Sequence, residues 1–209
     1  MIELEVDGKK VSVEEGTTVL EACHRAGADV PHFCYHPGLR NAANCRMCLV
    51  QVEGQRKPIP SCNVPVTPGM KVLSKGETVE PLRKSVLEFL LINHPLDCPI
   101  CDKAGECMLQ DNYYRYSRKP TVMKDPKVHK PKKEHVNDRI LYDGERCILC
   151  SRCVRFSDEV SKTKQIGIED RGDHSIVAFP KTHPYEDPYG DCITDICPVG
   201  ALTSKKFRF

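Results

Sequence analysis

Twelve side chains of this sequence have the residue types and the spacing of metal ligands. Eleven of the 13 cysteines and one histidine fall into three groups of four. Thiolate sulfur and imidazole nitrogen are the atoms through which proteins hold zinc and iron-sulfur clusters. The first group is Cys34, Cys45, Cys48 and Cys62; the second group is His94, Cys98, Cys101 and Cys107; the third group is Cys147, Cys150, Cys153 and Cys197. Two cysteines, Cys23 and Cys192, stay outside these groups, and we expect both to be structural thiols.

A disulfide framework is the competing use of so many cysteines. The first residues, Met1 to Asp7, include acidic side chains where an export signal needs a basic start and an apolar run. We therefore expect a cytoplasmic protein. In a reducing compartment, cysteines at short spacing more often bind metal than form disulfides. With a hydrophobic share of only 40%, the domains have thin cores that bound metal would stabilise.

The first group has the order of a ferredoxin-type [2Fe-2S] site. In such sites one loop supplies three thiolates and a distant strand end supplies the fourth. The gap between Cys34 and Cys45 is longer than the plant-type spacing, and it contains Pro37-Gly38 and small residues. Backbone amides of this loop can therefore approach the sulfurs. A four-cysteine zinc site is the alternative, although zinc motifs usually present two Cys-x2-Cys pairs.

The third group is the most specific of the three. A Cys-x2-Cys-x2-Cys run holds three corners of a [4Fe-4S] cluster, and a remote cysteine followed by proline supplies the fourth, as in bacterial ferredoxins. Pro198 follows Cys197, which favours Cys197 over Cys192 as that fourth ligand. No second triad accompanies this run, so we predict a single [4Fe-4S] cluster.

The second group is unusual because one of its four members is a histidine. A lone histidine is more often a surface or core residue. His94, however, lies four residues before a Cys-x2-Cys pair, and the group otherwise lacks a fourth ligand. A neutral imidazole in place of a thiolate removes one negative charge. We expect this change to raise the reduction potential of a bound cluster and to couple it to pH. Zinc held by the same four residues is the alternative.

The first 78 residues predict a small open sheet with one helix. Apolar residues alternate on both sides of an Asp7-Gly8 turn, which is the pattern of a β-hairpin. Thr18 and Glu21 fit a capping box at the start of a helix that Gly27 ends. Further strands are expected on the way to Cys62.

Residues 79–118 have a helical period instead. Pro81 suits a first helical turn, and Pro95 should end that helix. Its predicted inner face consists of Leu82, Val86, Phe89 and Leu90. A second helix is expected to begin near Gly105 and to include Cys107, Leu109 and Tyr113.

Two further segments complete the chain. Residues 119–135 are rich in proline and lysine and lack periodicity, so we interpret them as an extended linker along a surface. A docking strip for an acidic partner is the alternative. Residues 136–209 hold the third group and should close with a short strand or coil.

Several classes of function find no support in the residues. The net charge of +2 predicts no strong attraction to nucleic acid. No run of about 18 apolar residues occurs, so we expect no membrane span. Neither a Gly-x-Gly-x-x-Gly motif nor a P-loop is found. We therefore expect no bound dinucleotide or nucleoside triphosphate. Because an iron-sulfur cluster transfers electrons without making bonds in a substrate, we also expect no catalytic residues in this chain.

Four stretches carry a resemblance to a known family: His94–Asp111, Glu145–Phe156, the short Arg171–His174, and Asp195–Ser204. They closely resemble the N-terminal iron-sulfur region of the G subunit of NADH-quinone oxidoreductase, which is the 75 kDa subunit of respiratory complex I. The resemblance covers nearly the whole chain. All three groups fill the family's ligand positions.

The resemblance implies an α+β protein with three cluster domains. These are a β-grasp [2Fe-2S] ferredoxin domain at 1–78, a small helical [4Fe-4S] domain with one His and three Cys ligands at 79–118, and a ferredoxin-like [4Fe-4S] domain at 136–209. Residues 119–135 link the last two. One [2Fe-2S] and two [4Fe-4S] clusters would be the cofactors.

In function, the resemblance implies an electron-transfer subunit without a catalytic site of its own. Electrons would come from the flavin of an NADH-oxidising partner and pass through the clusters toward quinone. Further peripheral-arm subunits would attach the chain to the cytoplasmic face of the inner membrane. The family usually continues into a long molybdopterin-oxidoreductase-like domain, so the chain is either a natural short form or part of a longer one.

Three alternatives remain. The small diaphorase subunit of NAD-reducing hydrogenases is also similar, since it is short and carries the same three sites. A zinc-bound interaction or nucleic-acid module would use the same cysteines. A metal-stabilised scaffold would hold clusters that never change oxidation state, and His94 would then have no evident purpose.

Overall fold

The computed structural model describes residues 1–117, 119–121 and 123–207, and the chain divides into two compact units. Unit 1 comprises Met1–Tyr35 and Asn41–Leu87, and unit 2 comprises His36–Arg40 and Glu88–Phe209. Three residues of the predicted domains and one of the predicted linker lie outside the described residues: Arg118, Arg208 and Phe209, and Val122.

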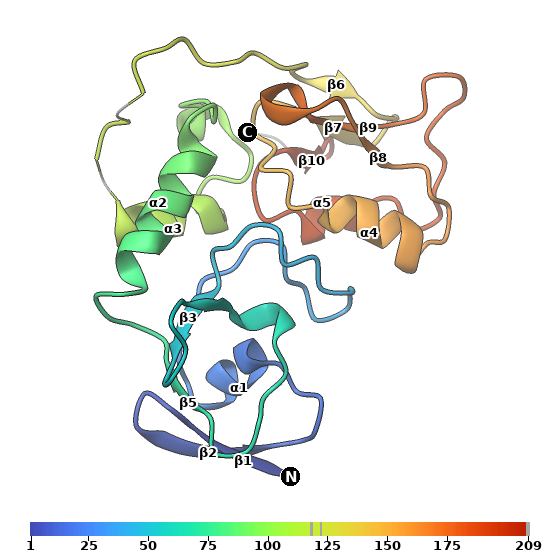
Figure 1. The fold of residues 1–209 in the computed structure, drawn as a ribbon. Coiled ribbons are helices and arrows are strands. Elements are labelled where there is room, and N and C mark those ends of the chain that lie inside the picture. Colours follow the sequence, from blue (N-terminus) through green and yellow to red (C-terminus); the bar gives the residue numbers. More distant parts are fainter. Residues whose placement is uncertain (118, 122, 208–209) are drawn as a thin grey trace. The chain divides into compact units, whose positions relative to one another are not determined.

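Unit 1 is built on a five-stranded sheet of order β2-β1-β5-β3-β4 (Figure 1). Its strands are β1 (Ile2–Val6), β2 (Lys9–Val13), β3 (Leu49–Val52), β4 (Ile59–Pro60) and β5 (Lys71–Leu73). The pair of β1 and β5 is parallel, and the other neighbouring pairs are antiparallel. The predicted hairpin is confirmed: Asp7 and Gly8 turn the chain with φ of 49° and 82°, as a type I′ turn requires.

Helix α1 (Val19–Arg25) packs against this sheet, and its predicted capping box is confirmed. The Thr18 hydroxyl accepts a hydrogen bond from the Glu21 amide, and the Glu21 carboxylate accepts one from the Thr18 amide at 2.8 Å. Gly27, with φ of 79°, follows the C-cap, as expected. Leu20 and Cys23 are fully buried with the valines of the sheet, so the core of unit 1 lies between α1 and the strands.

Helix α2 (Glu80–Leu91) begins with Pro81 in its first turn, as predicted. Its predicted apolar face is wrong at Leu82 and Phe89, whereas Val86 and Leu90 are half-buried. Phe89 is 75% exposed and Leu82 is 40% exposed, whereas Arg83 and Leu87 are fully buried. The guanidinium of Arg83 donates to the carbonyl of Leu49 at 2.6 Å, so a charged residue anchors the helix together with the apolar Leu87. The helix also ends at Leu91, before the predicted stop at Pro95.

Helix α3 (Met108–Tyr116) starts later than expected. Gly105 has φ of 85° and lies in the turn before the helix, and Cys107 is the N-cap residue, outside the helix proper. Leu109 is buried, as predicted. A 3₁₀ turn over Cys98–Ile100 lies between α2 and α3. The cysteines of the second group therefore come from turns and a helix start.

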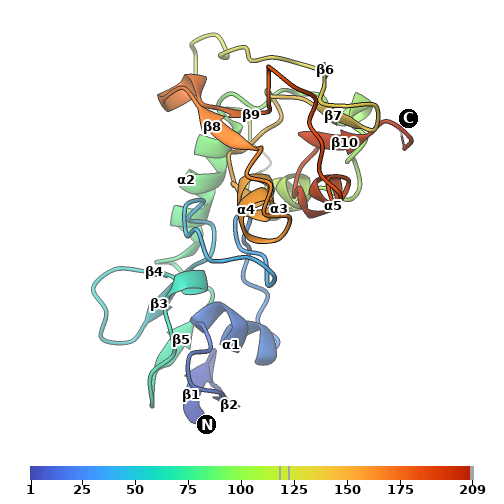
Figure 2. The same cartoon turned by 90° about the vertical axis from the view of Figure 1, so that its right-hand side faces the viewer.

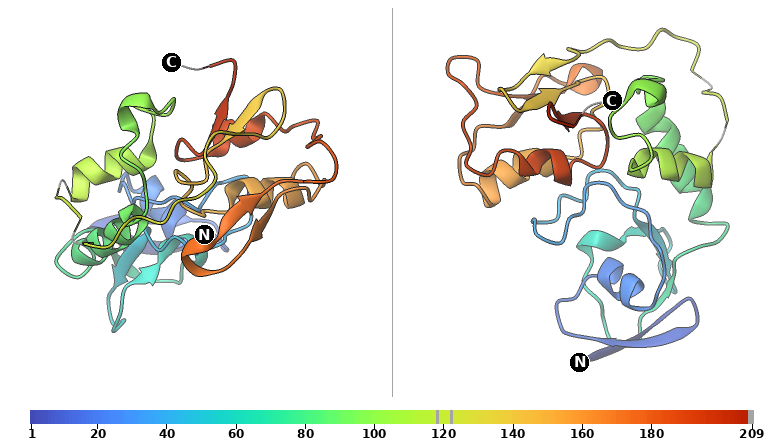
Figure 3. Two further views of the ribbon diagram at one scale, coloured as in Figure 1. Left: turned by 90° about the horizontal axis from the view of Figure 1, so that it is seen from above. Right: turned by 180° about the vertical axis from the view of Figure 1, so that it is seen from behind.

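The rest of unit 2 combines short strands and two helices. A three-stranded antiparallel sheet has the order β10-β7-β6, with β6 (Glu134–His135), β7 (Ile140–Tyr142) and β10 (Leu202–Ser204). Strands β8 (Gly167–Glu169) and β9 (Ile176–Ala178) form a separate hairpin (Figure 2). Helices α4 (Arg152–Glu159) and α5 (Cys192–Ile196) lie side by side (Figure 3). β10 confirms the expected closing strand.

Several described residues of the predicted linker form hydrogen bonds to other parts of unit 2 or belong to a strand. The Lys127 ammonium donates to the carbonyls of Leu91 and Ile92, at 3.1 and 2.6 Å. Lys130 donates to the carbonyl of Ser175 at 2.7 Å. The last two residues of the segment form β6, so it is not a freely solvated connector there. Among the described helices, none is both long and apolar enough to cross a membrane.

Candidate metal centres

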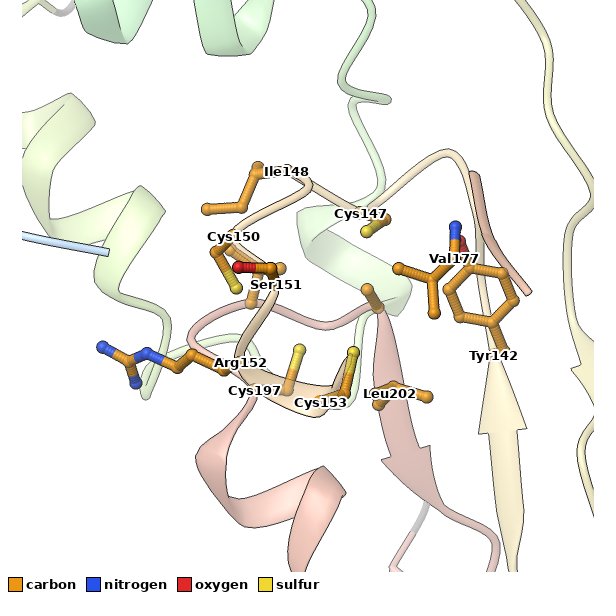
Figure 4. A pocket seen from close by; sticks show the side chains of 12 residues that line it. Tyr142, Cys147, Ile148, Cys150, Ser151, Arg152, Cys153, Val177, Cys197 and Leu202 are labelled. Carbon is orange, nitrogen blue, oxygen red and sulfur yellow. The ribbon is translucent and has the colours of Figure 1, made fainter. Parts of the chain in front are cut away.

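The four members of the third group line one cavity in unit 2. Figure 4 shows their sulfurs directed into a common space, with the ring of Tyr142 beside it. About 340 Å³ of space not filled by atoms lies there, part of it open to solvent. Apolar side chains complete the wall: Ile148, Val177, Val199 and Leu202. The predicted ligands are therefore brought together in an apolar pocket.

Local backbone geometry explains how one short loop gathers three of these cysteines. Leu149 and Ser151 adopt the left-handed conformation, with φ of 52° and 60°, which turns the chain sharply twice. The Leu149 amide donates to the sulfur of Cys147 at 3.4 Å. Cys153 lies in the first turn of α4, and Cys197 is the residue that caps the end of α5. Alternating turns of this kind direct amides inward and favour anionic groups.

Burial is the largest influence on the pKa values of three thiols of the third group. It raises the pKa of Cys147 to about 11 and that of Cys150 to about 12, and it raises the pKa of Cys153 as well. These thiols are therefore protonated in the apolar pocket itself. A bound metal would deprotonate them, since coordination stabilises the thiolate.

The second group lines another cavity in unit 2, with about 300 Å³ not filled by atoms. His94, Cys98, Cys101 and Cys107 all contribute to its wall. Its other lining residues include Asp97, Arg146 and Gly200.

His94 has the state that a metal ligand needs. Its Nδ1 is buried and has no hydrogen-bond partner within the described part of the chain. Burial, followed by the charges of Lys127 and Arg146, lowers the pKa of His94 to about 4. The imidazole is therefore neutral at neutral pH, which leaves a nitrogen lone pair available. Since an unsatisfied buried polar atom is costly, a ligand at this nitrogen would stabilise the site.

The first group comes together in unit 1. The Cys34 amide donates to the sulfur of Cys45 at 3.5 Å. Hydrogen bonds from the thiols of Cys45 and Cys62 lower the pKa of Cys34 to about 2, and one from Cys62 lowers that of Cys48 to about 7. Each of the four sulfurs therefore lies within hydrogen-bonding reach of at least one other.

Backbone amides approach the sulfurs of the first group, as the loop composition predicts. The amides of Asn44 and Cys45 lie at the Cys34 sulfur, and both lower the pKa of Cys34. The pKa of Cys45 is raised, first by its hydrogen bond to Cys34 and then by burial, and the Met47 amide at its sulfur partly opposes this rise. Ala43 and Arg46, with φ of 49° and 59°, provide the turns that direct these amides. Such hydrogen bonds favour the charged, metal-binding form of a thiol.

The two remaining cysteines differ from each other. Cys23 is fully buried in the core of unit 1, and burial raises its pKa to about 12, as expected of a structural thiol. Cys192 is exposed and does not line the cavity of the third group, so the interpretation as a packed thiol is wrong there. Within the described residues, no three His, Cys, Asp or Glu side chains form a group suited to a single metal ion.

Sequence reasoning missed two residues of the second cavity, Arg146 and Gly200. Each lies next to or near a predicted ligand of the third group: Arg146 directly precedes Cys147, and Gly200 follows Cys197 by three residues. Their positions in the sequence pointed only to the third group. The structure places both in the wall of the second cavity instead.

Comparisons with known proteins agree with this geometry. The chain is 45% identical over 209 residues to the NADH-quinone oxidoreductase G subunit of Rickettsia conorii, and 44% identical over 212 residues to the mitochondrial NADH dehydrogenase [ubiquinone] iron-sulfur protein 1 of Solanum tuberosum. Both matches cover 100% of this chain. A crystal structure of NAD+-reducing [NiFe]-hydrogenase contains a chain that superposes with a TM-score of 0.87 at 33% identity, covering 100% of this chain and 89% of that one.

The chain belongs to the family of the NADH-quinone oxidoreductase G subunit. The predicted resemblance is confirmed. The chain spans 31% and 28% of the length of the two curated family members named above.

Family models match three stretches of the chain, and each stretch contains one complete group. Residues 1–77 match a 2Fe-2S iron-sulfur cluster binding domain. Residues 83–120 match the NADH-ubiquinone oxidoreductase-G iron-sulfur binding region, and residues 137–203 match the ferredoxin-like domain of NADH-quinone oxidoreductase subunit 3. Iron-sulfur domains of the [2Fe-2S] and [4Fe-4S] types are therefore present.

Proposed function

We propose that the chain is the electron-transferring iron-sulfur part of an NADH:quinone oxidoreductase. It would receive electrons from the flavin of an NADH-oxidising partner and pass them toward quinone. One observation carries this proposal: twelve predicted ligands gather at three places, and each place lies in its own iron-sulfur domain of the family.

The cofactors would be one [2Fe-2S] cluster held by the first group and two [4Fe-4S] clusters held by the second and third groups. Support comes from the thiol contacts of the first group and from the two cavities. The strand order β2-β1-β5-β3-β4, with α1 packed on the sheet, supports a β-grasp fold for residues 1–78. The orphaned Nδ1 of His94 supports a helical domain at 79–118 with one His and three Cys ligands. A linker at 119–135 and a ferredoxin-like domain at 136–209 complete the proposal.

Electron transfer requires the protein only to bind the clusters and to provide their electrostatic environment. Iron-sulfur clusters take up and release single electrons without making bonds to a substrate. The side chains hold the metal, backbone amides near the sulfurs stabilise negative charge, and apolar residues such as Ile148 and Leu202 limit access of water. The chain itself would contribute no acid, base or nucleophile.

The partners in this proposal are a flavin-bearing NADH-oxidising subunit and further peripheral-arm subunits. Those subunits would attach the chain to the cytoplasmic face of the inner membrane. A second candidate is the diaphorase small subunit of an NAD-reducing hydrogenase. The hydrogenase chain of similar fold favours it, because this chain covers 89% of that one.

Metal and sulfide analysis tests the proposal directly. The anaerobically purified chain should be brown, should contain iron and acid-labile sulfide in the amounts of three clusters, and should give paramagnetic signals on reduction. Cys153→Ser should lower the iron and sulfide content by the amount of one [4Fe-4S] cluster. Cys192→Ser, a matched change at an exposed cysteine, should leave the iron and sulfide content unchanged. A colourless protein with zinc and no sulfide would refute the proposal. Clusters that stay oxidised while NADH turns over in the intact complex would support the scaffold alternative.

A further inference from the structure

Arg146 places a permanent positive charge in the wall of the second cavity. Its side chain is only 7% exposed, and it lines the cavity together with His94, Cys98 and Cys101. An arginine keeps its charge at all accessible pH values, so this charge is fixed. The proximity of Cys101 is one of the factors that raise the pKa of Arg146 against the opposing effect of burial.

Two carboxylates hold the guanidinium in position. Nη2 and Nε of Arg146 donate to the Asp97 carboxylate, at 3.0 and 3.2 Å. Nε also lies 3.4 Å from the carboxylate of Asp143. Two contacts from one guanidinium to a carboxylate fix its orientation better than a single point contact would.

The surrounding charges form a nearly balanced network. Lys132 lies 2.6 Å from Asp97, 2.8 Å from Glu145 and 3.7 Å from Asp143. His129 lies 2.7 Å from Glu145. Two fixed cations, Arg146 and Lys132, face three carboxylates, so loss of Arg146 would enlarge an existing excess of negative charge beside the cavity.

We propose that Arg146 tunes the electron affinity of the His-ligated cluster, an inference that rests on the proposed function. Adding an electron makes a cluster more negative, so a nearby cation stabilises the reduced form. The effect is large because a buried pair is weakly screened by solvent and salt. Arg146 thus works in the same direction as the neutral ligand His94, because both stabilise the reduced form of this cluster.

Potentiometric titration of the cluster-loaded full chain, followed by paramagnetic resonance, tests the role of Arg146. Arg146→Gln should weaken electron binding by the His-ligated cluster at least tenfold, a shift of about 59 mV to lower potential. Arg146→Lys keeps the charge and should recover most of the shift. Arg139→Gln, the same change at a half-exposed arginine paired with Asp191, should shift nothing.

A companion variant covers the case in which Arg146→Gln loses its cluster. Asp97→Asn removes a negative charge from the same wall and should raise the potential of the same cluster. A wild-type chain without a cluster at the second group would refute the proposed function. An unchanged potential of the cluster in Arg146→Gln would refute only the role of Arg146. If Arg146→Gln cannot be loaded with the cluster, an unchanged potential in Asp97→Asn would do the same.

Discussion

Gly200 and Cys101 are in direct contact: a Cβ atom on Gly200 would lie 2.2 Å from the sulfur of Cys101. Real Cβ atoms do not approach that closely, so only glycine fits here. Gly200 follows Cys197, a predicted ligand of the third group, by three residues. The carbonyl of Pro198 in the same segment accepts the Met108 amide at 3.2 Å, at the start of α3. The second and third groups therefore share a stretch of backbone.

Gly200→Ala should damage the second site more than the third. The added methyl group collides with Cys101, so we expect iron and sulfide to fall by the share of one [4Fe-4S] cluster, with loss of the corresponding paramagnetic signal. Gly167→Ala is the matched control, because a Cβ there meets no atom of the described residues within 4 Å. Equal and full loading of both variants would show that the contact does not limit the site.

His94→Cys should shift the His-ligated cluster to lower potential. A thiolate in place of a neutral imidazole adds one negative charge, which disfavours the reduced cluster. The measurement is a potentiometric titration of all clusters of the variant, with His174→Cys, a change at an exposed histidine, as the control. If no midpoint potential moves in the His94 variant, His94 is not a ligand.

The sequence predicts the position of a residue well where contacts with near neighbours in the chain determine it. It predicts the position poorly where contacts with distant segments do. The capping box of Thr18 and Glu21 is local, and the structure confirms it. The face of α2 depends instead on Leu49, which lies 34 residues before Arg83 and accepts its hydrogen bond. Helical periodicity alone therefore selected Phe89, which is exposed, over Arg83.

The candidate sites follow the same rule. Cysteine spacing predicted which residues gather in each cavity, since most members of a group lie within one loop or turn. Arg146 and Gly200 escaped prediction because they reach the second cavity from the segments that carry Cys147 and Cys197. Only the packing of unit 2 brings these distant segments to His94.

Arg83 should be essential for the stability of unit 1. Arg83→Ala removes a fully buried side chain and leaves the Leu49 carbonyl without this donor, so we expect a loss of about 3 kcal/mol in the free energy of unfolding. Arg83→Met keeps most of the apolar stem and should lose less. Lys84→Met, at the exposed neighbouring position, should stay within about 0.5 kcal/mol of wild type. Denaturant titration of the three variants would contradict this role of Arg83 if Arg83→Ala matched Lys84→Met.

Cys23 and Cys192 should differ in reactivity because one is buried and the other exposed. With iodoacetamide at mildly alkaline pH, the loaded protein should be alkylated at Cys192 within minutes, while Cys23 stays protected until the chain unfolds. Peptide mass spectrometry after timed quenching distinguishes the two sites. Rapid labelling of Cys23 under native conditions would show that α1 opens readily from the sheet.

The raised pKa of Cys23 also predicts how stability depends on pH. In the unfolded chain this thiol loses its proton above pH 9, whereas in the folded chain it keeps the proton up to about pH 12. Between these values the unfolded state binds fewer protons, so stability should fall as pH rises, by up to about 1.4 kcal/mol per pH unit. Cys23→Ala removes this group and should flatten the decline, even if the small cavity costs about 1 kcal/mol at neutral pH. Melting temperatures of both proteins from neutral pH to about pH 10.5 provide the comparison, and parallel curves would mean that Cys23 does not contribute to the decline.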